Sequence, residues 1–197
     1  MKLKQKLFTI LFLTISTIGI AQDYKNELKK EFNDYLSTIV NMEFEKSMEY
    51  IVPEFFEIIP KSQMIKVMKQ AFNNPGIEIE ITNPKIIEVK DKKEIENKYY
   101  SLLTYSNQMN MKIYGEAEET KNEKTTRINL TKLSLESTFG SENVEYNENT
   151  DFFQIQSQKD VYGISKNGEN NWKFLVIEKK QKMILEKLLP KELSEKI

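Results

Sequence analysis

The amino-acid sequence predicts an α+β protein, in which N-terminal helices pack on an antiparallel sheet and a further helix ends the chain. Two observations carry this prediction. Up to residue 72, apolar residues recur at spacings of three and four, which is typical of amphipathic helices. From residue 77 onwards Ile alternates with Glu, and several later segments repeat at a spacing of two. The Asn-Asn-Pro-Gly stretch at 73–76 marks the change of period.

Residues 1–21 have the layout of a cleaved secretory signal. Lysines precede an apolar run at 7–20, and small residues stand at Gly19 and Ala21, where a signal peptidase reads the chain. The run is shorter than the ~18 apolar residues typical of a membrane-spanning helix. We therefore expect an exported protein, periplasmic or secreted, without stable membrane insertion after cleavage. Residues 22–197 are expected to form a single domain.

The composition excludes several classes of function. The formal net charge is -1, from 29 basic and 30 acidic residues, which argues against a nucleic-acid partner. The chain has no His and no Cys, so Ser-His-Asp chemistry and thiolate or imidazole zinc sites are excluded, and no cofactor is expected. The lack of Cys in an exported chain favours a bacterial source. An Ala-Gln cleavage junction resembles those of the Bacteroidota.

Three helices are expected before the sheet. The first covers 28–40 and carries one apolar stripe, with Lys, Glu and Asn on its other face. The second is short, at 43–51, and Pro53 ends it or marks a turn. The third covers 62–72 and stops at the Asn-Asn-Pro-Gly stretch.

The first strands of the expected sheet follow residue 77. Residues 77–81 form a half-buried strand that Pro84 interrupts, and residues 86–89 either continue it or form a bulged edge. Residues 99–105 are apolar on both faces, as in a central strand. The next strand covers 109–113 after a turn at Asn107, unless the two segments form one long bent strand.

The second half of the chain mixes helices and strands. After a charged, exposed segment, a helix is expected over 126–138, ending at Gly140. A polar turn at 166–170 separates the last two strands. A tail helix runs from residue 183 to Pro190. The three C-terminal strands are expected at 152–157, 160–165 and 172–178.

This order of elements resembles the nuclear transport factor-like superfamily, also called SnoaL-like. The residues that carry the resemblance are the helix 28–40, the segment 48–56 and the strand 171–175, which begins with Trp172 after a polar turn. The resemblance implies a cone, in which a strongly curved antiparallel sheet wraps around the first helix. The superfamily contains enzymes as well as binding domains, so the resemblance assigns no catalytic residue here.

The mouth of such a cone would be lined by aromatic and Met side chains of the sheet. Tyr and Trp offer an apolar body with a polar tip, and Met adapts to irregular ligands. The alternative is that these side chains fill the core between sheet and helix. The candidate pocket walls are Tyr99, Tyr105, Met109, Met111, Tyr162 and Trp172.

Two polar features can each belong to a binding site or to the solvated surface. Arg127, the only arginine, can hold a carboxylate ligand or lie in solvent. The acidic stretches at 116–119 and 147–151 can bind calcium through oxygen ligands or form solvated turns.

The sequence therefore favours a non-catalytic exported module that binds a small apolar molecule or a protein partner. The second hypothesis is a structural domain that forms a homodimer through its sheet. The third is an enzyme that uses carboxylate or Tyr acid–base chemistry, which requires a buried Asp or Glu with a raised pKa.

Overall fold

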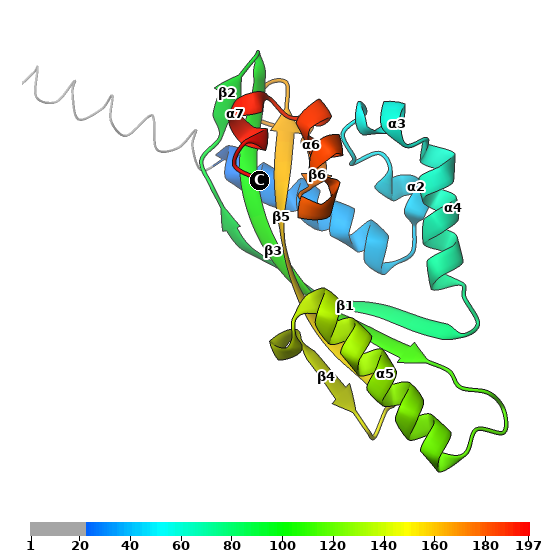
Figure 1. The fold of residues 1–197 in the computed structure, drawn as a ribbon. Helices are drawn as coiled ribbons and strands as arrows, with labels where there is room; N and C mark the ends of the chain where they lie inside the picture. The colour runs from blue at the N-terminus through cyan, green and yellow to red at the C-terminus, as the bar shows by residue number, and fades with distance from the viewer. Residues whose placement is uncertain (1–22) are drawn as a thin grey trace, which may run out of the picture.

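The structure, a computed structural model, describes residues 23–197 (Figure 1). It is an α+β protein with a six-stranded antiparallel sheet, N-terminal helices and C-terminal helices, as the sequence predicts. The expected secretory signal at 1–21 lies outside the described residues.

The N-terminal helices confirm two of the three expectations. The N-terminal helix covers residues 23–40, and α4 covers Lys61–Phe72. The expected helix at 43–51 is wrong in length, because α2 covers only Phe44–Ser47 and α3 adds one turn at Phe55–Ile58. Between α2 and α3 the chain forms turns on either side of Ile51, which makes a parallel bridge with Phe174, and the Phe174 N–H donates to the Tyr50 carbonyl at 2.7 Å. This segment covers an edge that would otherwise be open.

The sheet has the order β1-β3-β5-β4, with β2 paired to β3 and β6 paired to β5. Each pair of neighbouring strands is antiparallel. The strands are β1 (Ile77–Val89), β2 (Lys93–Ile95), β3 (Lys98–Ile113), β4 (Val144–Asn147), β5 (Phe152–Ser165) and β6 (Lys173–Val176).

Two long strands form the axis of the molecule. A turn at Asn107 was one of two expectations, and it is wrong, because β3 runs unbroken through that residue as the long-strand alternative predicts. The expected separation of 152–157 from 160–165 is also wrong, since both belong to β5. The β3–β5 ladder has no register shift between its end pairs, Tyr99–Ser165 and Met111–Phe153. Alternate residues therefore keep to one face along the whole length.

β1 continues past Pro84, as one of the two interpretations expected. Its pairing with β3 shifts register between Thr82 and Lys85, and again between Ile86 and Glu88. The first irregularity contains Pro84, which has no N–H for the ladder.

The sheet divides into two halves along β3 and β5. In the enclosed half, which contains β3 residues 98–106 and β5 residues 157–165, helices cover both faces (Figure 1). One face packs on the N-terminal helix, and the buried side chains there are Leu28, Phe32, Leu103, Val161, Trp172 and Phe174. The other face packs on the segment 48–55 and on α6 and α7, and its buried side chains include Met48, Phe55, Tyr100, Tyr162, Ile164, Leu175 and Leu185.

The α5 half contains β3 residues 107–113, β5 residues 152–156, β4 and the helix α5 (Lys121–Phe139). The apolar side of α5 covers the odd-numbered β3 residues Met109 and Met111. These lie on the same sheet face as Leu103, which the N-terminal helix covers. In Figure 1 the N-terminal helix passes behind the sheet and α5 lies in front of it. Because the long strands twist strongly, the same face of the sheet points backwards at one end and forwards at the other.

The opposite face of the α5 half is polar. The alternate side chains of β3 and β5 there are Gln108, Asn110, Lys112, Gln154 and Gln156. The Gln156 amide donates to Gln108 at 3.1 Å, and the Gln108 amide donates to Asn110 at 2.6 Å. Such an amide-rich face is suited to water.

Two elements of the α5 half differ from the expectation. α5 begins five residues before the expected residue 126, because Thr120 and Glu123 form a capping box that starts the helix earlier. It ends at Gly140, as predicted. β4 was not expected: the sequence analysis assigned residues 144–146 to no element and interpreted 147–151 as a calcium site or a solvated turn.

The chain ends in two short helices, α6 (Lys182–Leu188) and α7 (Lys191–Ser194). Pro190 ends α6, as expected, and then begins α7. Leu185, Leu189 and Leu193 bring these helices onto the sheet.

Candidate functional site

A hollow of about 440 Å³ lies where the strands of the enclosed half end. We call it the end hollow. It is formed by residues 52–54, by Lys98 at the start of β3, by the end of β5 and by the loop that leads to β6. Its volume lies within the range of pockets that hold small molecules.

The floor of the end hollow is apolar. Val52 and Ile164 line it, and both belong to the buried core together with Phe55 and Tyr100. Pro53 stands beside them at the surface. A ligand in the hollow would therefore rest directly on the core of the protein.

The loop 166–171 forms one wall, and its own hydrogen bonds fix its shape. Ser165 is 2% exposed, and its hydroxyl donates to the Asn170 carbonyl at 2.6 Å and accepts from the Gly168 N–H at 3.1 Å. The Asn167 side-chain oxygen accepts from the N–H groups of Glu169 and Asn170. The sequence predicts this turn correctly, because Asn and Gly favour such local bonds.

The loop 166–171 is also fixed by contacts with residues that do not line the hollow. The Lys92 ammonium donates to the Gly168 carbonyl at 2.7 Å and lies 4.2 Å from the centre of the Tyr24 ring. Gly168 has a φ of +71°, and a Cβ at this position would meet the Tyr99 ring at 2.6 Å. Only glycine fits this contact without strain.

The N-terminal helix fixes the far end of the same loop. The Glu31 carboxylate accepts from the Asn171 N–H at 2.8 Å and from the Trp172 N–H at 2.6 Å. Bonds from backbone N–H groups to a carboxylate are among the strong ones. The wall of the end hollow is therefore formed before any ligand arrives.

Charged side chains form the rim. Lys98 donates to Glu54 at 2.7 Å, and this bond lowers the pKa of Glu54 and raises the pKa of Lys98. The Lys173 ammonium donates to the Glu49 carbonyl at 2.7 Å. Lys166, which is exposed, forms no ion pair or hydrogen bond through its ammonium with residues 23–197.

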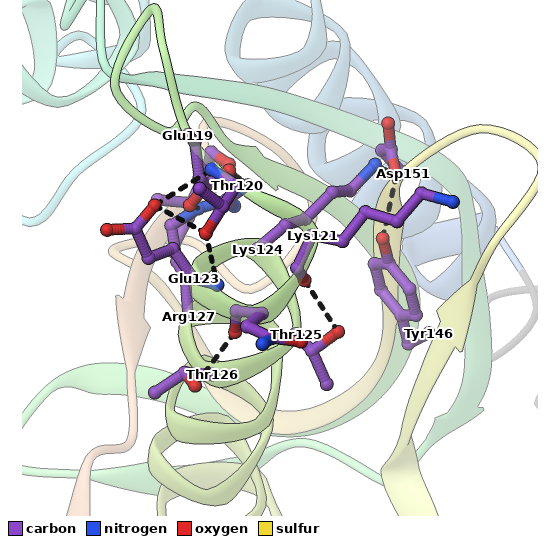
Figure 2. Close-up of polar contacts among 12 residues, drawn as sticks. Glu119, Thr120, Lys121, Glu123, Lys124, Thr125, Thr126, Arg127, Tyr146 and Asp151 are labelled. Carbon is purple, nitrogen blue, oxygen red and sulfur yellow. Dashed lines mark hydrogen bonds and ion pairs between the residues drawn. The ribbon is translucent and has the colours of Figure 1, made fainter.

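A second polar site lies at the start of α5 (Figure 2). Arg127 donates from Nε and Nη2 to the two carboxylate oxygens of Glu119, both at 2.7 Å, and from Nη1 to the Ile113 carbonyl at 2.6 Å. This pairing lowers the pKa of Glu119. Arg127 is three-quarters covered, so it is neither free for a ligand nor fully in solvent. It closes the connection between β3 and α5.

Asp151 anchors the β4–β5 turn to α5 in the same region (Figure 2). The Lys124 ammonium donates to it at 2.8 Å, and the Tyr146 hydroxyl donates at 2.7 Å. Both bonds lower the pKa of Asp151. Burial and the bond to Asp151 raise the pKa of Tyr146 to about 12. Because Lys124 of α5 and Tyr146 of β4 both donate to Asp151, this cluster attaches α5 to the β4–β5 turn.

A broad hollow of about 580 Å³ adjoins this cluster. Lys121, Lys124 and Lys132 line one side, and Glu145, Glu148 and Asp151 line the other. Within residues 23–197 no group of three or more acidic side chains is arranged to hold a metal ion. The calcium interpretation of the stretches 116–119 and 147–151 gains no support there.

The six predicted pocket residues fall into three places. Tyr99, Tyr105 and Trp172 face the N-terminal helix, and Trp172 is fully buried. Tyr162 lies on the opposite face of the sheet. Met109 and Met111 lie under α5. The structure therefore does not bring them together, and contact of any of them with a ligand stays a prediction.

The residues that line the end hollow were missed as a group. Some of these residues stand out in the sequence: Lys166 begins the predicted turn, Lys173 follows it, and Pro53 interrupts the segment before α3. What the sequence does not reveal is that residues 52–54 lie beside that turn.

The carboxylates of the described part of the chain show no sign of general-acid tuning. Among residues 23–197, no Asp or Glu is buried. Each carboxyl group whose pKa is shifted there has a lowered pKa, as for Glu54, Glu119 and Asp151. A raised pKa would be needed for a carboxylic acid that donates a proton near neutral pH.

Comparison of the chain with protein-family models, with curated proteins and with solved structures finds no match. The resemblance to the nuclear transport factor-like superfamily, with its cone, stays a prediction. Within residues 23–197, no helix has the length and apolar character needed to cross a bilayer.

Proposed function

We propose that this protein is an exported, non-catalytic module that binds a small, largely apolar molecule in the end hollow. The observation that carries the proposal is the combination of an apolar floor with a wall that is already formed. A preformed site loses little conformational entropy on binding, so a small apolar contact area can give useful affinity. Export rests on the N-terminal sequence alone.

Native mass spectrometry of the protein purified gently from its source tests the proposal first. We expect an added mass that disappears on denaturation. Its exact value would then name the class of ligand.

A blocking variant places the ligand in the end hollow. Pro53 lies at the surface beside the floor, so Pro53→Trp fills the hollow without disturbing a buried side chain. A ligand identified by mass should raise the melting temperature of the wild type and fail to raise that of Pro53→Trp.

Pro75→Trp is the matched control, since Pro75 is also exposed but lies in the turn before β1. It should keep the full ligand-induced shift. Equal shifts in all three proteins would show that the end hollow is not the site.

The alternative of a structural domain that dimerises through its sheet has one supporting observation. The outer edge of β1 pairs with no strand of residues 23–197. Against it, Pro84, Lys85 and the register shifts of β1 are features that discourage strand addition. Light scattering of the mature protein decides: a stable dimer would favour assembly, and a monomer at high concentration would remove it.

A further inference from the structure

We propose that the ligand of the end hollow is a carboxylate, with its charged group at the rim and a compact apolar body on the floor. This inference rests on the proposed function, because it names the chemical class that the same hollow selects. It follows from the placement of three lysines.

The strand register places these lysines around one apolar side chain. Lys173 of β6 pairs directly with Ile164 of β5. Lys98 stands one residue before Tyr99, which pairs with Ser165, so it reaches the same end of the ladder from β3. Lys166 follows Ile164 by two residues, which puts it on the same face when the strand direction is continued. All four line the end hollow.

Among the residues that line the end hollow, three are lysines and one, Glu54, is a carboxylate. Glu54 pairs with Lys98, and the charge of Lys166 also contributes to the lowered pKa of Glu54. Lys173 donates to a neutral carbonyl, so its charge is not cancelled. The rim therefore carries an excess of positive charge beside an apolar floor, and an anion at this place gains attraction from more than one lysine.

The hollow beside α5 provides an internal comparison. There, three lysines stand against three carboxylates, and Lys124 is paired with Asp151. Lysines are common over the surface, but the end hollow differs from the hollow beside α5 because three lysines and one carboxylate line it together with the buried side chains Val52 and Ile164. The positive and negative charges are balanced at the hollow beside α5 but not at the end hollow, so the end hollow favours an anionic ligand.

Matched probes test the inference. Benzoate and benzamide share one apolar body and differ in charge, as do octanoate and octanamide. Titration of the isotope-labelled mature protein, followed by amide NMR shifts of residues 164–173, measures the affinity of each probe at this site. We expect each carboxylate to bind about fivefold more tightly than its amide at low salt. High salt should reduce this preference, because the rim is exposed.

Lys166→Gln tests the rim directly, since it removes one positive charge and no structural bond of residues 23–197. It should reduce the preference for the carboxylate about threefold and leave binding of the amide unchanged. Lys66→Gln on α4 is the control, because Lys66 is equally exposed and lies away from the end hollow. It should change neither affinity.

The outcomes separate the two proposals. If amides and carboxylates bind equally at residues 164–173, the hollow is a binding site but the charge selection is wrong. If carboxylates shift only resonances elsewhere, or if Lys166→Gln keeps the full preference, the inference is also overturned. If no probe and no natural ligand binds at the end hollow, the proposed function fails as well.

Discussion

The enclosed half and the α5 half are built from the same two strands but are stabilised in different ways. In the enclosed half, both sheet faces are buried, and Trp172, Phe32 and Leu103 have no exposed surface. In the α5 half, one face is buried over a small cluster around Phe153 and Ile155, and the other is polar. The α5 half depends more on ion pairs and hydrogen bonds, which contribute less per contact than apolar burial.

We therefore expect the enclosed half to be rigid and the α5 half to open by itself. Regions with few buried apolar contacts open at a lower free energy than the whole molecule. The end hollow lies at the extreme end of the enclosed half, where a preformed shape can be kept. Three experiments test whether the two halves differ in this way.

The largest effect is expected from matched Phe→Ala changes in the two halves. Phe174 and Phe153 are both buried, at 2% and 1% exposed. Phe174→Ala should cost about 3–5 kcal/mol of the free energy of unfolding, because it leaves a cavity in the larger core. Phe153→Ala should speed hydrogen exchange of α5 and β4 while the amides around Leu103 stay protected.

Hydrogen exchange followed by mass spectrometry distinguishes the two variants. Loss of protection throughout the chain in Phe153→Ala would show that the halves unfold as one unit, and the comparison would then be wrong.

A smaller effect is expected from two glycines. Gly168→Ala places a Cβ against the Tyr99 ring and keeps a positive φ, so it should destabilise the protein by about 1–3 kcal/mol. It should also weaken ligand binding at the end hollow, because the wall must move. Gly76→Ala, just before β1, meets only the Asn74 side chain at 3.4 Å and should change stability by less than about 1 kcal/mol.

Thermal unfolding of both variants is the measurement. Equal melting temperatures for Gly168→Ala and the wild type would mean that the loop 166–171 is not fixed.

The smallest effect is expected from acid. Bonds from Arg127 and Lys124 lower the pKa values of Glu119 and Asp151 in the folded state. The stability they contribute is present above the ordinary carboxyl pKa of about 4 and is lost as the pH falls through the lowered values. The enclosed half also loses an ion pair in acid, that of Lys98 with Glu54, but it keeps its larger apolar core, so the α5 half should loosen first.

Two optical signals separate the halves during an acid titration. Trp172 is the only tryptophan and lies in the enclosed half, so its fluorescence reports on that half. The circular dichroism signal comes from all the helices and so includes that of α5. We expect the dichroism to change at a higher pH than the fluorescence, and coincident transitions would contradict the expectation.

The same contrast explains what the sequence could and could not predict. The N-terminal helix and α4 each have one periodic apolar pattern, which predicted helices at 28–40 and 62–72. β3 and β5 cross from one half to the other, so their burial changes along the strand. Polar residues at the crossing, such as Asn107 and Lys159, then resemble a turn.

Other misses have local causes. The Thr120–Glu123 capping box is visible in the sequence and could have placed the start of α5. β4 has only four residues, too few for a pattern. The end hollow needs residues 52–54 beside residues 164–173, and no local signal carries that proximity.

The bonds from Glu31 to Asn171 and Trp172 have a consequence for the order of synthesis. They join positions 140 and 141 residues apart, and the Phe174 N–H reaches back to Tyr50. A growing chain that stops before residue 172 contains β3 and β5 but lacks Trp172 and Phe174, two of the buried side chains on which its first helix packs. Contacts of such sequence separation form late and slowly. The packing of the N-terminal helix is therefore completed only when nearly the whole polypeptide has been made.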